Sequence, residues 1–193
     1  LSVPQILSVV DEEGLRRLFA RWKPQIVFHA AAHKHVDLME QNRSEAVRNN
    51  VEGTRCLLKI VEEYRCERFL LISTDKAVDP INTMGRTKLL GELLTALARE
   101  QNPNTDYRVV RFGNVLGSRG SVIPLFLEQI RRGGPITITD PQMKRYFMSI
   151  PEAVSLVLES GCVEDSSGVF VLEMGRPVSI LSLAEGIVRQ CGL

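Results

Sequence analysis

Short apolar runs alternate along the first half of this chain with longer segments whose apolar residues recur at helical spacing. The runs at 25–30, 68–72 and 107–112 have the length and composition of buried strands. Strands separated by helices, without tight hairpin turns, predict a parallel sheet with crossover helices, and hence an α/β fold. The segments with helical spacing are 11–22, 44–64 and 84–100.

The pattern changes from Ser118 onward, where glycine-rich loops separate shorter elements. We expect these residues to form a smaller lobe, so that the chain divides into a domain of residues 1–117 and a lobe of residues 118–193. The elements predicted for the lobe are helices at 122–132 and 150–160, and strands at 136–138 and 169–172.

Composition and charge exclude several classes of function. Lys and Arg number 24 against 23 Asp and Glu, and this near balance gives no support for a nucleic-acid groove or a polybasic membrane patch. The four cysteines form no CxxC pair and show no metal-finger spacing, which favours a reducing, cytoplasmic setting. No apolar run approaches the roughly 18 residues needed to span a bilayer, so we expect no membrane segment in this chain.

The polar stretch Ser73–Lys88 follows the apolar run 69–72 directly. It contains an adjacent acid and base, Asp75 and Lys76, and ends on a second lysine, Lys88, at the start of a predicted helix. Open parallel sheets place their chemistry in loops of this kind, at the carboxyl ends of strands. The alternative interpretation is a pair of solvated loop charges.

Two further stretches favour a bound nucleotide. Ala30, Ala31 and Ala32 end a predicted strand with small side chains, which leaves room for a cofactor to approach the backbone. A metal site at the neighbouring histidines is the competing interpretation, but a zinc site normally needs three or four ligands at recognisable spacing. The Gly-, Ser- and Asn-rich loop at 111–121 precedes a predicted helix N-terminus, which suits a pyrophosphate. An ordinary flexible loop is the alternative there.

Six motifs occur in order along the chain, and together they resemble the extended short-chain dehydrogenase/reductase family of nucleotide-sugar 4,6-dehydratases. The nearest type is UDP-N-acetylglucosamine 4,6-dehydratase of polysaccharide biosynthesis. The motifs are His-Ala-Ala-Ala-His-Lys-His-Val (29–36), Asn-Asn-Val-Glu-Gly-Thr (49–54), Ser-Thr-Asp-Lys-Ala-Val (73–78), Met84-x-x-x-Lys88, Arg-Phe-Gly-Asn-Val-Leu-Gly-Ser-Arg-Gly-Ser-Val-Ile-Pro (111–124) and Arg-Tyr-Phe-Met (145–148).

The resemblance implies a Rossmann-like, doubly wound parallel sheet that binds NAD or NADP within residues 1–117. It implies a UDP-sugar as substrate of the lobe 118–193, and a homo-oligomer in the full protein. The implied reaction oxidises carbon 4 of the sugar, removes water across carbons 5 and 6, and returns the hydride to carbon 6.

The resemblance also assigns roles at the stretch Ser73–Lys88. Lys76 would remove the carbon-5 proton, Asp75 would protonate the departing 6-hydroxyl, and Thr74 would hydrogen-bond the 4-hydroxyl. Met84 occupies the catalytic position where the family usually has an acid–base tyrosine. A thioether cannot exchange protons, but the family has a branch with Met at this position, and the resemblance implies that Asp75 or Thr74 then manages the 4-hydroxyl proton. Lys88 would hold the cofactor.

The remaining implied contacts are with the cofactor and the nucleotide sugar. The cofactor residues are Asp11, Ala30, Ala31, Ala32, Asn50, Ser73 and Lys88. The substrate residues are Lys34, Asn114, Ser118, Ser121, Val122, Ile123 and Arg145.

One departure from the family is the missing Gly-rich fingerprint, G-x-G-x-x-G, which supplies the helix N-terminus for the cofactor pyrophosphate. We therefore expect an internal fragment of a longer dehydratase, which binds NAD poorly by itself. Two alternatives stay open. One is a nucleotide-sugar epimerase of the same fold, which usually keeps the tyrosine that Met84 replaces. The other is a non-catalytic nucleotide-binding module.

Overall fold

The structure is a computed structural model that describes residues 2–118, 120–164 and 168–193. The described residues divide into two compact units. The first unit comprises the residues up to Arg111 together with Ser160–Val171, and the second comprises Phe112–Glu159 with Leu172–Leu193. Each unit is described by itself below.

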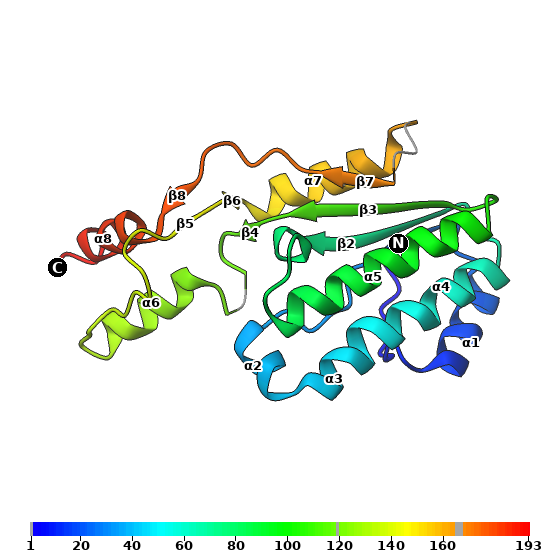
Figure 1. The fold of residues 1–193 in the computed structure, drawn as a ribbon, viewed down its shortest axis with the longest axis horizontal. Helices are drawn as coiled ribbons and strands as arrows, with labels where there is room; N and C mark the ends of the chain where they lie inside the picture. The colour runs from blue at the N-terminus through cyan, green and yellow to red at the C-terminus, as the bar shows by residue number, and fades with distance from the viewer. Residues whose placement is uncertain (1, 119, 165–167) are drawn as a thin grey trace. The chain divides into compact units, whose positions relative to one another are not determined.

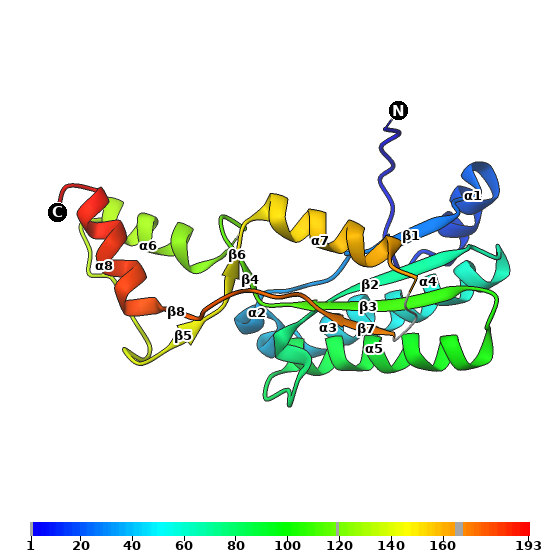
Figure 2. The ribbon, with the colours of Figure 1, turned by 90° about the horizontal axis from the view of Figure 1, so that it is seen from above.

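The first unit is built on a four-stranded sheet in the order β1-β2-β3-β7. Strand β1 pairs in parallel with β2, with Val27 opposite Phe69, and β3 pairs in parallel with β7. The arrows of β2 and β3 point the same way (Figure 1), and the strands lie side by side in Figure 2. The parallel α/β sheet expected from the sequence is confirmed. The strands are β1 (Ile26–His29), β2 (Arg68–Thr74), β3 (Asp106–Phe112) and β7 (Val169–Val171).

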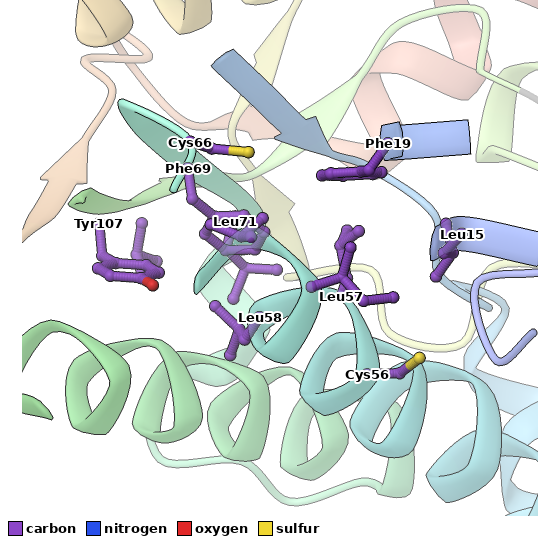
Figure 3. Packing of buried hydrophobic residues seen from close by; sticks show 12 residues of the cluster. Leu15, Phe19, Cys56, Leu57, Leu58, Cys66, Phe69, Leu71 and Tyr107 are labelled. Atoms are coloured by element: carbon purple, nitrogen blue, oxygen red, sulfur yellow. The ribbon is translucent and has the colours of Figure 1, made fainter. Parts of the chain in front are cut away.

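Helices α1 (Glu12–Trp22), α4 (Gly53–Glu63) and α5 (Thr83–Gln101) lie on one side of this sheet (Figure 1). Side chains alternate across a strand, so Phe69 and Leu71 of β2 face these helices together. They form the main core with the apolar stripe of α4, and Figure 3 shows this packing. The buried cluster consists of Leu15, Phe19, Cys56, Leu57, Leu58, Ile60, Val61, Cys66, Phe69, Leu71, Tyr107 and Val109.

The helix predicted at 44–64 is interrupted. It consists of α3 (Arg43–Val47), a π-helical turn at Arg48–Glu52, and α4. The turn carries the buried side chain of Asn50, which bonds outside the helix. Single π-turns of this kind often mark functional sites. A further short helix, α2 (Val36–Gln41), was not predicted.

The second unit holds α6 (Val122–Arg131), α8 (Ile180–Gln190) and two small sheets. The small sheets pair β4 (Asn114–Val115) with β6 (Phe147–Met148), and β5 (Lys144–Arg145) with β8 (Val178–Ser179). Phe126, Ile180, Ala184 and Ile187 form its core.

The strand predicted at 136–138 is wrong, because this segment is irregular. Its isoleucines, Ile136 and Ile138, pack against the core of the second unit. The Gln129 side chain bonds both the backbone nitrogen of Thr137, at 3.2 Å, and its hydroxyl, at 2.7 Å. The Gln129 side chain therefore accepts the backbone hydrogen bond of Thr137 that a neighbouring strand would accept in a sheet.

Helix α7 (Ile150–Cys162) begins in the second unit, and its last residues belong to the first. There the Arg108 guanidinium donates to the carbonyl oxygen of Ser160 at 2.5 Å, and Arg68 donates to that of Gly161. Asp106 accepts from both arginines, at 2.8 Å and 3.0 Å. Strand β7 also belongs to the first unit. The first unit therefore includes residues 160–171, which the division predicted after residue 117 had assigned to the lobe. No helix within the described ranges has the length and apolarity to cross a bilayer.

Candidate active site

The predicted acid and base lie in the loop that follows β2. The strand ends at Thr74, and a single 3₁₀ turn, Asp75–Ala77, comes next. The Thr74 hydroxyl donates to Asp75 Oδ1 at 2.9 Å, and the Lys76 ammonium lies 3.0 Å from the same oxygen. The side chains of Lys76 and Asp75 are 29% and 39% exposed, so a ligand can reach them. The structure therefore brings these three predicted residues together.

The start of α5 is packed closely against this loop. A Cβ atom placed on Gly85 would collide with the carbonyl oxygen of Lys76. The Asn82 side chain caps the helix by accepting from the Gly85 nitrogen at 2.8 Å. The Glu40 carboxylate accepts from the Thr83 nitrogen, and this bond lowers the pKa of Glu40. The helix therefore begins at a defined place beside Lys76.

Lys88 extends from the second turn of α5 to the end of β2. Its Nζ atom donates to the carbonyl oxygen of Ile72 at 2.7 Å. Burial lowers the pKa of Lys88 to about 8, against the opposing effect of the Glu92 carboxylate. Lys88 and Lys76 therefore both lie near the carboxyl end of β2, on different elements.

Met84 is buried in a small apolar cluster with Met39 and Ala46, and Val36 packs against it. Only 4% of its surface is exposed. The position that the family usually gives to a tyrosine is thus filled by an apolar packing contact.

The loop after β1 is held by Asn50. Its amide oxygen accepts from the His33 nitrogen at 2.7 Å, and its amide nitrogen donates to the His33 carbonyl at 2.9 Å and to the Thr87 hydroxyl at 3.0 Å. Within this loop Ala30 and Ala31 are exposed, and Ala32 is half-buried. Asn50, predicted as a cofactor contact, is itself 3% exposed and bonded inside the protein.

His29 is a member of this network that sequence reasoning did not assign. Its Nε2 atom lies 2.9 Å from the Thr54 hydroxyl, which in turn donates to the Asn50 carbonyl at 2.7 Å. Because the hydroxyl proton is used in that bond, Nε2 of His29 must be the protonated nitrogen. Burial first, and then the charge of Lys88, lowers the pKa of His29 to about 4.

A buried ion pair beside Lys88 was also missed. Glu92, 5% exposed, accepts from the hydroxyl of Ser73 and from the Arg111 guanidinium, whose Nε lies 2.9 Å from Oε1. Ser73, predicted as a cofactor contact, is therefore committed to Glu92. The available signal was the spacing, because Glu92 follows Lys88 by one helical turn.

The other predicted contacts of the first unit are less enclosed. Asp11 caps α1, accepting from the Gly14 nitrogen at 2.9 Å. Lys34 is exposed. Among the described residues, no group of three or more His, Cys, Asp or Glu side chains is placed to hold a metal ion.

The predicted substrate residues other than Lys34 lie in the second unit. Ser121 precedes α6, and its hydroxyl oxygen is buried without a hydrogen-bond partner among the described residues. Val122 and Ile123 are half-buried and pack against the core of the second unit. Asn114 lies in β4, Ser118 is half-buried, and Arg145 is exposed on β5.

Comparison with known proteins shows extensive similarity. Residues 1–193 match the family described as polysaccharide biosynthesis protein. The capsular polysaccharide biosynthesis protein CapD of Staphylococcus aureus is 50% identical over 190 residues, which are 98% of this chain and 32% of CapD. A UDP-glucose 4-epimerase of Rickettsia massiliae is 48% identical over 134 residues, which are 68% of this chain and 39% of that protein.

The solved structure of Pen from Bacillus thuringiensis has a TM-score of 0.91 to this chain at 34% identity. The match covers 97% of this chain and 57% of Pen. The chain therefore spans only a portion of the length of each of these proteins.

Proposed function

The chain belongs to the polysaccharide biosynthesis protein family, and on that basis we propose that it carries the elimination site of a nucleotide-sugar 4,6-dehydratase. UDP-N-acetylglucosamine is the proposed substrate. The family and its fold, that of the extended short-chain dehydrogenases/reductases, are those expected from the motifs. The observation that carries the proposal is the contact of Asp75 with Lys76 at the carboxyl end of β2.

The surroundings of this pair suit NAD or NADP. Exposed Ala30 and Ala31 leave the end of β1 open to a flat group, and Lys88 supplies an amine at the end of β2. When bound, NAD or NADP would supply the acceptor and donor of the hydride. Asn50 and Ser73 would support this site through His33 and Glu92 rather than contact the cofactor.

The 3.0 Å contact between Asp75 and Lys76 provides both proton transfers of an elimination. A shift of one proton from the Lys76 ammonium to the Asp75 carboxylate gives a neutral amine and a neutral acid without changing the net charge. The amine then takes the carbon-5 proton, while the acid protonates the 6-hydroxyl, which leaves as water. Because each group ends in its original state, the elimination restores the ion pair. Thr74, bonded to Asp75, would bind the 4-hydroxyl, and the proton that this hydroxyl loses when carbon 4 is oxidised would pass along Thr74 to solvent beside the partly exposed Asp75–Lys76 pair.

The second unit would bind the nucleotide diphosphate. The buried Ser121 hydroxyl at the start of α6 has no hydrogen-bond partner among the described residues, and the first-turn N–H groups of Val122 and Ile123 suit an anion. Asn114, Ser118 and Arg145 of this unit, together with Lys34, are the further proposed contacts. The cationic side chains Lys34 and Arg145 are exposed and so accessible to phosphate oxygens.

A nucleotide-sugar 4-epimerase is the second candidate, because several relatives from Rickettsia carry the name UDP-glucose 4-epimerase. Epimerisation requires proton exchange at the 4-hydroxyl and no acid–base pair for loss of water. The buried thioether of Met84 cannot exchange a proton in either reaction, whereas an acid–base contact such as that of Asp75 with Lys76 is needed only by the dehydratase. These observations favour the dehydratase.

The test is to incubate the protein that carries this chain with UDP-N-acetylglucosamine in deuterated water. NMR should detect a 4-keto-6-deoxy sugar with deuterium at carbon 5. Lys76→Met should abolish the product, whereas Lys59→Met, at an exposed lysine of α4, should not. Inversion at carbon 4 alone would identify an epimerase, and unchanged sugar would reject both candidates.

A further inference from the structure

Glu92 joins three elements at the carboxyl end of the sheet. Its carboxylate accepts from the Ser73 hydroxyl, next to the end of β2, and from Arg111 near the end of β3. Glu92 itself belongs to α5, one turn after Lys88, whose ammonium donates to the Ile72 carbonyl. Two successive turns of α5 are therefore bonded to two successive residues of β2.

This carboxylate is more deeply buried than its partner. Glu92 is 5% exposed, while the Arg111 side chain is 24% exposed. An unpaired buried charge is strongly destabilising, so a buried acid needs cations or hydrogen-bond donors around it. Arg111 and Ser73 satisfy the carboxylate directly, and Lys88 on the neighbouring turn adds a second positive charge.

We propose that Glu92 is a positioning residue that acts through Lys88, as the counter-charge that keeps the Lys88 ammonium charged beside the end of β2. The inference rests on the proposed function only in taking Lys88 as the residue that holds the cofactor. An ammonium donates three hydrogen bonds, and loss of its proton would remove one donor and the charge together. The second predicted lysine, Lys76, has its own acid in Asp75.

Other ionisable groups lie on the elements packed against this region of α5. His29 on β1 feels the charge of Lys88 and has a pKa of about 4, so it is neutral near pH 7. Asp75 and Lys76 in the 3₁₀ turn pair with each other, and Arg111 on β3 is bonded to Glu92. Glu92 is therefore the anion that opposes the effect of burial on Lys88, whose pKa is about 8.

The test measures the titration of Lys88 in this chain without cofactor or sugar. Competitive acetylation between pH 6 and 11, read by mass spectrometry of the Lys88 peptide, reports the midpoint of each lysine. Glu92→Gln should move the midpoint of Lys88 to lower pH. Arg111→Gln, which leaves Glu92 to act on Lys88 alone, should move it to higher pH. Glu100→Gln, at the exposed end of the same helix, is the matched control and should leave it unchanged.

Opposite shifts separate this role from mere structural support. Loosened packing would admit water and raise the midpoint of Lys88 toward its ordinary value in both variants. An unchanged or raised midpoint in Glu92→Gln overturns the proposal. If Glu92→Gln does not fold, as judged by circular dichroism, Glu92→Asp takes its place: its shorter side chain draws the carboxylate back, and an unchanged or raised midpoint of Lys88 in that variant contradicts the proposal. A failed sugar assay would leave these midpoints unaffected, so the two proposals fail separately.

Discussion

The Nζ atom of Lys76 lies 3.0 Å from Oδ1 of Asp75, so an acid and a base that are adjacent in sequence are also in direct contact. The 3₁₀ turn Asp75–Ala77 allows this contact, because both side chains leave the same tight turn. The start of α5, packed closely against this loop at Gly85, helps to hold the pair in place.

Gly85 is expected to be irreplaceable at the start of α5. Alanine usually stabilises a helix by about 1 kcal/mol relative to glycine, but a Cβ at this position collides with the Lys76 carbonyl. Gly85→Ala should therefore lower the free energy of unfolding by about 1–3 kcal/mol and displace Lys76. Urea denaturation followed by fluorescence of Trp22, the single tryptophan, measures this.

The matched control for that variant is Gly91→Ala in the same helix. A Cβ on Gly91 would lie 3.5 Å from Leu71 Cδ2, an ordinary contact. Gly91→Ala should therefore be neutral or stabilising. Equal effects of the two alanines would contradict the steric explanation.

Met84→Tyr restores the family's usual residue and should nevertheless be harmful. The larger ring and its hydroxyl would be buried with Met39 and Ala46, and overpacking alone costs about 1–3 kcal/mol. We expect a lower urea midpoint and no gain of 4-epimerase activity. Leu93→Tyr, at an exposed site of α5, serves as the control and should be tolerated. A Met84→Tyr protein of normal stability would show that this position is open to the site.

His29 should make the first unit less stable in acid. Its pKa is about 4 in the folded protein and about 6.5 in an unfolded chain. The unfolded state therefore binds the extra proton between these values, and stability falls as the pH drops from 6.5 toward 4, by up to about 1.4 kcal/mol per pH unit. In His29→Asn this contribution to the pH dependence should disappear. His35→Gln, at an exposed histidine, should keep it, and an unaltered slope in His29→Asn would refute the assignment.

Asn50→Asp should release the loop after β1. Aspartate keeps an acceptor for the His33 nitrogen but loses the donors to the His33 carbonyl and the Thr87 hydroxyl. Leaving such buried groups unsatisfied costs about 1–3 kcal/mol each. Hydrogen exchange should show faster exchange at residues 30–35, with a lower free energy of unfolding. Asn104→Asp, at an exposed turn, should change neither.

Sequence reasoning succeeded where the determining contacts are local. The apolar runs located β1, β2 and β3 to within two residues of their ends, because a buried strand needs a continuous apolar segment. Asp75 and Lys76 could be identified from the sequence as a candidate acid and base, because they are adjacent residues in a short loop after a predicted strand.

It failed where contacts are distant in sequence. The π-turn at Arg48–Glu52 depends on Asn50 bonding to His33 and Thr87, and nothing within the helix itself predicts it. The ion pair of Glu92 with Arg111 joins residues 19 positions apart. Residues 136–138 have the composition of a strand, yet the Gln129 side chain satisfies the backbone there.

The pairing of β3 with β7 also constrains the order in which the first unit forms. Val109 lies opposite Val169, and the whole of α6 and α7 separates them in the chain. During synthesis, the backbone groups of β3 that pair with β7 therefore have no partner strand until residues 169–171 have been synthesised. Non-local pairing of this kind slows folding. Nascent chains that stop before residue 169 would expose an apolar strand edge to neighbouring chains, which is a hazard for aggregation.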